Sequence, residues 1–208
     1  MKILSIHPDN PQQRYVDQVL DHLKRGGVLA YPTDTCYGLG CSIFQKKAID
    51  AVYRIKRMRD DKPLSFICSD LKNIAQFAQV SNKAYRLMRR LLPGPYTFVL
   101  PATREVPKLL QNKRKQVGIR IPDHPVILEI VRQLDHPIIS TTCQEEGEEL
   151  ACADVYDIKE RFGHLLELAI DGDYICPEVS TVVSIDENEE VHVLREGKGD
   201  VAPLLAAV

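Results

Sequence analysis

Short apolar runs alternate with segments of helical periodicity along almost the whole chain, and this alternation restricts the fold more than any single motif does. In residues 12–25, apolar side chains recur every three or four positions before Gly26 and Gly27 end the predicted helix. Further helices are predicted over residues 46–57, 70–77, 81–91, 125–134 and 153–163. The predicted strands cover residues 2–6, 28–32, 64–68, 96–100, 117–121, 137–141, 166–170, 180–186 and 190–195. Because strands separated by helices favour parallel pairing and adjacent strands favour hairpins, the sequence predicts an α/β fold with a mixed, twisted sheet.

Length and composition place the chain among ordinary globular proteins. With 208 residues, of which 44% are hydrophobic and 27% charged, it is long enough to bury a sizeable core. We expect a single domain over residues 1–208, with residues 197–208 as a loosely held C-terminal tail. No apolar run approaches the roughly 18 residues that a membrane-spanning helix needs, and the first residues lack a signal-peptide layout. The expected location is therefore the cytoplasm, with no membrane partner.

The six cysteines and six histidines form no motif for metal binding or nucleophilic catalysis. No C-x-x-C pair occurs, so the cysteines are expected to be reduced thiols rather than ligands of a structural metal. The histidines show no H-x-x-x-H spacing, and no Ser-His-Asp or Cys-His arrangement can be argued. We therefore predict no metal-ligating residue.

The net charge of −2 conceals a strong polarity along the chain. Residues 1–120 carry 22 Lys and Arg against 9 Asp and Glu, whereas residues 121–208 carry 5 against 20. If the halves occupy different faces, this polarity predicts a basic surface that attracts phosphates. If the halves interleave in space, the two charges cancel.

Residues 31–40 join an apolar strand to a stretch rich in small and hydroxyl-bearing residues. Pro32 removes a backbone donor, so the strand is expected to end there. Gly38 and Gly40 would allow a ligand to approach the backbone closely, although a plain strand-to-loop connection explains them equally well. Neither of the generic glycine-rich phosphate motifs, G-x-x-x-x-G-K-[ST] and G-x-G-x-x-G, occurs in the chain.

The stretch over residues 31–40 resembles the opening signature of the YrdC/YciO family, whose best-known members are threonylcarbamoyl-AMP synthases. Residues 6–14 resemble the YciO branch of that family. Further matches follow in the same order at residues 56, 63–64, 93–100, 118–125, 180–183 and 194–197. The resemblance implies a YrdC-like twisted open mixed sheet, flanked by helices, with a large, basic, concave cavity.

A cluster of five cations lies between residues 54 and 62, at the end of a predicted helix. Such a cluster suits a triphosphate or an RNA backbone, or it forms a solvated helix end balanced by Asp60 and Asp61. Lys56 resembles the lysine of the family's K-x-R motif, which implies a catalytic, electrostatic role for it. The nucleotide- and phosphate-binding residues implied by the resemblance or by this cluster are Lys56, Arg57, Arg59, Lys62, Thr142, Gln144 and Arg195.

The half of the site that would face ATP departs from the family pattern. The second K-x-R position holds Met58, and Lys62 and Ile67 replace an asparagine and a histidine of the synthases. The S-x-N motif falls on residues 142–144, and four glutamates follow within residues 145–149. Because acidic side chains repel phosphates, the resemblance implies an adenylate-forming activity that is weak or altered.

In the half of the site that would bind the amino acid, the residues match the family pattern more closely. Thr35, Arg120 and Ser180 match positions that contact the amino acid in the family. A guanidinium pairs well with a substrate carboxylate, which is the role implied for Arg120. Without the resemblance, a structural ion pair with Asp123 or Glu129 would be the preferred explanation of Arg120.

The resemblance implies that ATP, L-threonine and bicarbonate form threonylcarbamoyl-AMP and pyrophosphate for the t6A modification of tRNA. ATP would bring Mg²⁺ as part of the substrate, and no tightly bound cofactor is expected. One alternative is a non-catalytic protein that binds tRNA or double-stranded RNA in the basic cavity. Another is a transferase for a different amino acid or nucleotide. The sequence implies no oligomeric state.

Overall fold

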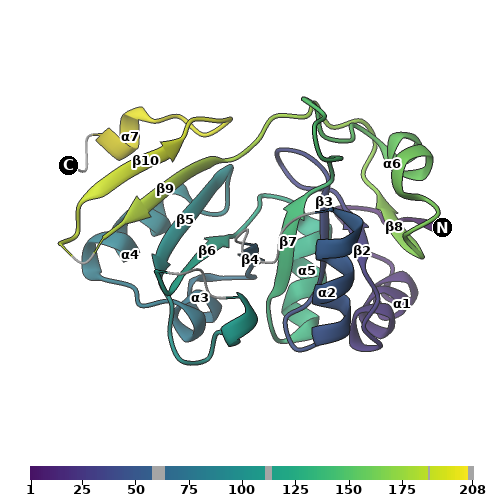
Figure 1. Cartoon of the computed structure of the whole chain (residues 1–208), viewed down its shortest axis with the longest axis horizontal. Coiled ribbons are helices and arrows are strands. Elements are labelled where there is room, and N and C mark those ends of the chain that lie inside the picture. The colour runs from purple at the N-terminus through teal and green to yellow at the C-terminus, as the bar shows by residue number, and fades with distance from the viewer. Residues whose placement is uncertain (58–63, 111–113, 187, 206–208) are drawn as a thin grey trace.

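The computed structural model describes residues 1–57, 64–110, 114–186 and 188–205, and it contains one ten-stranded sheet flanked by helices (Figure 1). The strands are β1 (Lys2–Ser5), β2 (Leu29–Tyr31), β3 (Gly38–Ser42), β4 (Ser65–Ile67), β5 (Tyr96–Pro101), β6 (Gln116–Arg120), β7 (Ile138–Thr142), β8 (Leu168–Asp171), β9 (Thr181–Ile185) and β10 (Val191–Arg195). The helices are α1 (Gln13–Lys24), α2 (Lys46–Ile55), α3 (Leu71–Phe77), α4 (Asn82–Leu91), α5 (Pro125–Leu134), α6 (Val155–Phe162), α7 (Ala202–Leu205) and the short 3₁₀ helix η1 (Lys108–Leu110).

The strands lie in the order β1-β8-β2-β3-β7-β4-β6-β5-β9-β10. Parallel pairs (β1–β8, β2–β8, β4–β6 and β5–β9) occur together with antiparallel ones, which confirms the predicted mixed sheet. Strands from the two halves of the chain interleave in this order, so the two halves are not separate lobes of the sheet.

The two faces of the sheet are covered to different extents. Successive residues of a strand point to opposite faces, so Ala30 and Phe66 pack on one face and Leu29 and Ile67 on the other. Helices α2, α3, α4 and α6 cover the first face with their buried side chains. Helices α1 and α5 cover the second face, where they pack on β1, β2, β7 and β8. Among the described helices, none covers the second face over β6, β5 and β9.

Besides the short 3₁₀ helix η1, two elements in the described residues were not predicted from the sequence. Strand β3 occupies part of the stretch that was interpreted as a turn. Its glycines make room for Tyr31: a Cβ on Gly38 would lie 2.8 Å from the Tyr31 ring, and one on Gly40 would lie 2.2 Å from the carbonyl oxygen of Ile139. Gly40 therefore permits strand packing rather than the approach of a ligand.

The second unpredicted element is α7, which lies in the segment expected to be a loose tail. That expectation is wrong for the described part of the segment. The Thr181 hydroxyl donates to the carbonyl of Gly199 at 2.6 Å, and the Tyr96 hydroxyl donates to the carbonyl of Asp200 at 3.1 Å. Leu204 is completely buried. The helix lies beside β10 at the end of the sheet opposite the N-terminus (Figure 1).

Two further features bear on the sequence expectations. Within the described residues, no helix combines the length and the apolar character needed to cross a bilayer. All six cysteines are free thiols, of which only Cys176 is exposed.

Candidate functional site

A cavity of about 650 Å³ lies over the part of the sheet that no helix covers. Its described lining contains three arginines and no acidic residue, so it suits an anionic ligand. The lining residues are Thr33, Cys36, Tyr37, Gly38, Leu64, Ser65, Ile67, Thr97, Val99, Arg114, Gln116, Gly118, Arg120, Ser140, Thr141, Thr142, Ser180, Val182, Leu194 and Arg195.

The register of the strands separates the arginines into two ends of this cavity. Ser140, Ser65 and Gly118 lie side by side on β7, β4 and β6. From that level, β7 runs towards Thr142 in one direction and β6 runs towards Arg120 in the other. Their backbones are thus four positions, or about 13 Å, apart along the strands. Both side chains nevertheless reach the signature turn, Arg120 at Asp34 and Thr142 at the Cys36 thiol. Arg114 precedes β6 at the end of that strand opposite Arg120.

At the Arg120 end, three predicted residues meet. The Arg195 guanidinium donates to the Ser180 carbonyl through Nε at 3.1 Å and through Nη2 at 2.9 Å. The same Nη2 lies 3.2 Å from the Ser180 hydroxyl, which lies 2.9 Å from the Thr97 hydroxyl. Arg195 and Ser180 therefore form one hydrogen-bonded unit beside Arg120 in the cavity wall.

Arg120 is ion-paired with Asp34 through Nη2 and Oδ1, and neither Asp123 nor Glu129 is its partner. The two side chains are only 9% and 12% exposed. Glu129 instead pairs with Arg132 at 2.6 Å on the surface of α5. The expected ion pair thus exists, but with a carboxylate from the signature segment.

Three polar atoms around this pair are buried and lack a hydrogen-bond partner: Arg120 Nε, Asp34 Oδ2 and His124 Nδ1. Such an atom costs about 1–3 kcal/mol, because it has lost its hydration without replacement. Burial also lowers the pKa of His124, which favours its neutral form. A polar ligand beside Arg120 would relieve part of this cost.

The signature turn itself is held by Thr33. Its hydroxyl donates to the carbonyl of Cys36 at 2.6 Å and accepts from the backbone N–H groups of Thr35 and Cys36. Thr35 is fully buried and its hydroxyl lies 3.1 Å from that of Thr33. Of the two threonines in the signature turn, Thr33 lines the cavity and Thr35 does not.

The predicted nucleotide- and phosphate-binding residues lie in different places. Thr142 and Arg195 line the cavity. Lys56 and Gln144 lie outside the lining: the buried Lys56 ammonium donates to the backbone carbonyl of Gln144, and the Gln144 side chain donates to the carbonyl of Glu148 at 2.6 Å. Arg57 is exposed after α2, with a positive φ of 48°. Arg59 and Lys62, like Met58, lie outside the described residues.

Sequence reasoning missed several residues of the cavity. Arg114 lies in a run of three basic residues just before β6, and this run could have identified it. Asp34 and Cys36 belong to the signature, but nothing in a single sequence distinguishes the residue that pairs with Arg120. Burial raises the pKa of the Cys36 thiol, so this wall residue is neutral rather than nucleophilic.

Comparisons with known proteins support the fold described above. A family model described as "Telomere recombination", which joins Sua5, YciO and YrdC, matches residues 21–197. The uncharacterized protein YciO of Escherichia coli K12 is 41% identical over 201 residues, which cover 96% of this chain and 97% of YciO. The crystal structure of E. coli YciO superposes with a TM-score of 0.92 at 38% identity and covers 98% of both chains.

More distant relatives carry a functional name. A threonylcarbamoyl-AMP synthase of Vibrio vulnificus is 29% identical over 161 residues, which cover 76% of this chain and 86% of the synthase. The crystal structure of P. abyssi Sua5 complexed with L-threonine has a TM-score of 0.92 at 23% identity, and the match covers this whole chain and 61% of the Sua5 chain. At 23% identity, the similarity to Sua5 shows a shared fold alone. Because the family model matches residues 21–197 and the chain is 41% identical to E. coli YciO, the chain belongs to the Sua5/YciO/YrdC family.

Proposed function

We propose that this protein binds L-threonine and ATP in the cavity and forms threonylcarbamoyl-AMP, with a rate lowered by its altered phosphate half. The observation that carries the proposal is the placement of arginines at both ends of one cavity of about 650 Å³. The amine of threonine and bicarbonate would form an N-carboxylate with loss of water. This carboxylate would attack the α-phosphate of ATP and expel pyrophosphate.

The Arg120 end is proposed for the amino acid. Arg120 Nε is a buried donor without a partner, so a substrate carboxylate would supply the hydrogen bond that it lacks. Ser180 and Thr33 would offer hydroxyls to the same ligand, and Arg195 holds Ser180 in place. Thr35 would support this end indirectly, through its contact with Thr33.

The end of the cavity that holds Arg114 is proposed for the triphosphate. Arg114 and Thr142 both line the cavity, and Mg²⁺ would arrive with ATP as part of the substrate. Lys56 lies behind this wall and would have to exchange the Gln144 carbonyl for a phosphate oxygen during the reaction. That exchange, together with the exposed glutamates that follow Gln144, is the physical reason to expect slow adenylate formation.

The test is pyrophosphate release by the purified protein with ATP, Mg²⁺ and bicarbonate, with and without L-threonine. We expect release that depends on threonine and falls about 100-fold in Arg120→Ala, as when one anchoring donor to the reacting group is lost. Lys56→Ala should lower the rate while leaving threonine binding unchanged. Arg132→Ala removes an exposed arginine outside the cavity and should behave as wild type. Absence of both ATP binding and threonine-dependent release would disprove the proposal.

A second candidate, binding of tRNA or double-stranded RNA, rests on the outer face of α4. Arg86, Arg89 and Arg90 are exposed on that helix, next to the partly exposed Lys83. A polyanion held by such a face should bind more weakly as salt rises, with a linear dependence of log affinity on log salt concentration. An affinity for duplex RNA that does not change between 50 and 200 mM salt, roughly the range in which phosphate contacts are screened, would exclude this mode.

A further inference from the structure

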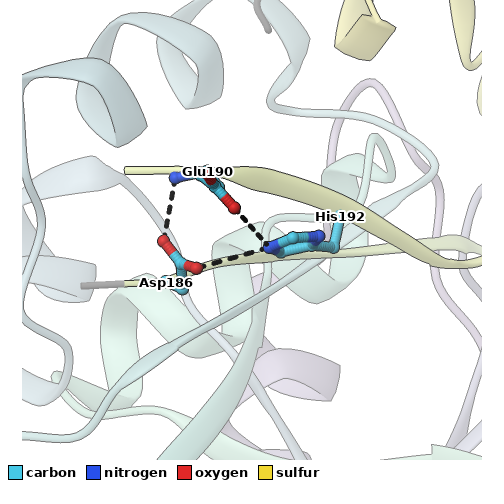
Figure 2. A group of neighbouring side chains, drawn as sticks. All are labelled: Asp186, Glu190 and His192. Atoms are coloured by element: carbon cyan, nitrogen blue, oxygen red, sulfur yellow. Dashed lines mark hydrogen bonds and ion pairs between the residues drawn. The ribbon is translucent and has the colours of Figure 1, made fainter. Parts of the chain in front are cut away.

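The turn between β9 and β10 gathers three side chains of the kinds that bind metal ions. His192 Nε2 lies 3.3 Å from Asp186 Oδ2 and 3.8 Å from Glu190 Oε2 (Figure 2). The three possible ligand atoms all lie within 4.8 Å of one another. None of the three residues lines the large cavity, so this group is separate from the proposed synthase site.

The strand geometry explains why the three side chains converge. Asp186 and Glu190 close the hairpin, with the N–H of Asp186 donating to the carbonyl of Glu190 at 3.1 Å. Residues paired across an antiparallel ladder share a face, and His192 shares it because it lies two positions beyond Glu190. Glu190 and His192 lie two positions apart along the chain, and Asp186 lies opposite Glu190. One imidazole nitrogen and two carboxylate oxygens are therefore presented on the same face of the hairpin.

This arrangement favours a cation between the carboxylates. Two like charges opposite each other on a hairpin are destabilising unless a positive charge neutralises them. Hydrogen bonds also fix the orientation of the Asp186 carboxylate. Its Oδ1 accepts hydrogen bonds from the backbone N–H groups of Asn188 and Glu190, both at 2.9 Å, and its Oδ2 faces His192.

The neighbouring charged groups do not compete for this position. The Glu189 carboxylate accepts hydrogen bonds from the Ser81 hydroxyl and from the backbone N–H of Lys83, so it faces the N-terminus of α4. Only Asp186, Glu190 and His192 are brought together as metal-ligand types among the described residues.

We propose that Asp186, Glu190 and His192 bind a divalent cation of Zn²⁺ type at the tip of the β9–β10 hairpin. Ligands about 2.0–2.1 Å from a tetrahedral zinc ion lie roughly 3.3 Å from one another. The two measured separations from His192 Nε2, 3.3 and 3.8 Å, are close to that value, so small side-chain rotations complete the site. One imidazole with two carboxylates suits Zn²⁺ better than Ca²⁺ or Mg²⁺, which take six or more oxygen ligands. Water would fill the fourth position.

The bound ion would stabilise β10, the edge strand of the sheet. Strand β10 is the last strand in the order and pairs only with β9 in the sheet (Figure 1). A metal that joins Asp186 to His192 cross-links the end of β9 to β10. Because Arg195 and Ser180 lie at the other end of the same hairpin, the ion would stiffen the element that carries them to the cavity.

The test is a calorimetric titration of the metal-free, full-length protein with Zn²⁺ in a buffer that does not chelate. We expect one ion per chain, with an affinity that falls at least about tenfold in His192→Ala and in Glu190→Gln, as for the loss of one ligand. His164→Ala removes an exposed histidine elsewhere, and Cys176→Ser removes the exposed thiol. Both controls should keep the wild-type affinity. Equal affinity in wild type and His192→Ala would overturn the proposal.

Thermal unfolding gives a second, independent readout. Zn²⁺ should raise the melting temperature of the wild-type protein, because a ligand that binds only the folded state stabilises it. The same ion should leave that of His192→Ala unchanged. In EDTA the two proteins should melt alike, since His192 is exposed and the variant loses no packing. If His192 acts only as a protonated partner of the carboxylates, Zn²⁺ will stabilise neither protein, and the proposal fails.

Discussion

At the scale of single residues, Arg120 already has a carboxylate partner before any ligand enters the cavity. The pair with Asp34 is largely buried, so neither charge can rely on water for stabilisation. Asp34→Ala should therefore leave a buried, unpaired guanidinium and lower the free energy of unfolding by about 3 kcal/mol. Urea denaturation monitored by circular dichroism measures this change.

The Glu129–Arg132 pair provides the matched control for that experiment. Arg132 is largely exposed, so Glu129→Ala should change the free energy of unfolding by less than about 1 kcal/mol. A similar loss in both variants would mean that burial does not distinguish the two ion pairs. An unchanged stability in Asp34→Ala would mean that solvent reaches Arg120 freely.

Two histidines give the stability a predictable dependence on pH. Burial lowers the pKa of His124 and of His136, whose ring nitrogen lies 2.7 Å from the Ser42 hydroxyl. In the unfolded chain both should titrate near their ordinary value of about 6.5. The unfolded state then binds more protons below that pH, so the free energy of unfolding should fall as the pH drops from 7 to 5.5.

Denaturation with urea at a series of pH values tests this dependence. A double variant, His124→Asn with His136→Asn, should lose most of the slope between pH 7 and pH 5.5, because the two imidazoles cause it. A slope of the same size in the double variant would assign the effect to other groups.

At the scale of elements, α7 is the clearest case of a segment that tertiary contacts define. Leu204 is completely buried, whereas its neighbour Leu205 is 62% exposed. Leu204→Ala should cost about 2–5 kcal/mol of stability, the usual range for an emptied leucine site. Leu205→Ala should cost little, since its side chain is mostly in water. Thermal melts of the two variants compare these costs, and equal effects would argue against the docking of α7.

The elements that were predicted and those that were missed differ in a physical way. Helix α5 matches its predicted range of residues 125–134, because Pro125 begins it and apolar residues recur along it. Strand β3 contains two glycines, which have low strand propensity, and forms because the Tyr31 ring packs over them. Local patterns thus predict elements that bury their own side chains, and fail where a distant residue supplies the packing.

The same distinction applies to the site. Arg120, Ser180, Arg195 and Thr142 were predicted by resemblance, and the fold brings all of them to one cavity. The pairing of Arg120 with Asp34 joins segments far apart in the chain, so no local pattern could indicate it. The hydrogen bond from Lys56 to the Gln144 carbonyl likewise joins the end of α2 to the segment after β7, far apart in the chain.

At the scale of the whole molecule, the burial of the cysteines reports how tightly the sheet and helices pack. Cys176 is exposed and the other five are buried, and burial raises the pKa of Cys41 to about 12. Only one thiol should react rapidly with a maleimide in the native protein, and all six should react in urea. Intact-mass measurement counts the adducts. Cys176→Ser should abolish the rapid reaction, and several rapid adducts on the native protein would contradict the tight packing.

The strand order also has a consequence for synthesis on the ribosome. Strand β8 lies between β1 and β2, yet it is made long after both of them. The nascent chain therefore exposes two strand edges that have no partner until residue 171 has left the exit tunnel. Such late, non-local pairing slows folding and leaves the unfinished sheet open to association with other chains. Chaperones that shield nascent strands should accordingly matter more for the yield of this protein than for that of a helical protein of equal length.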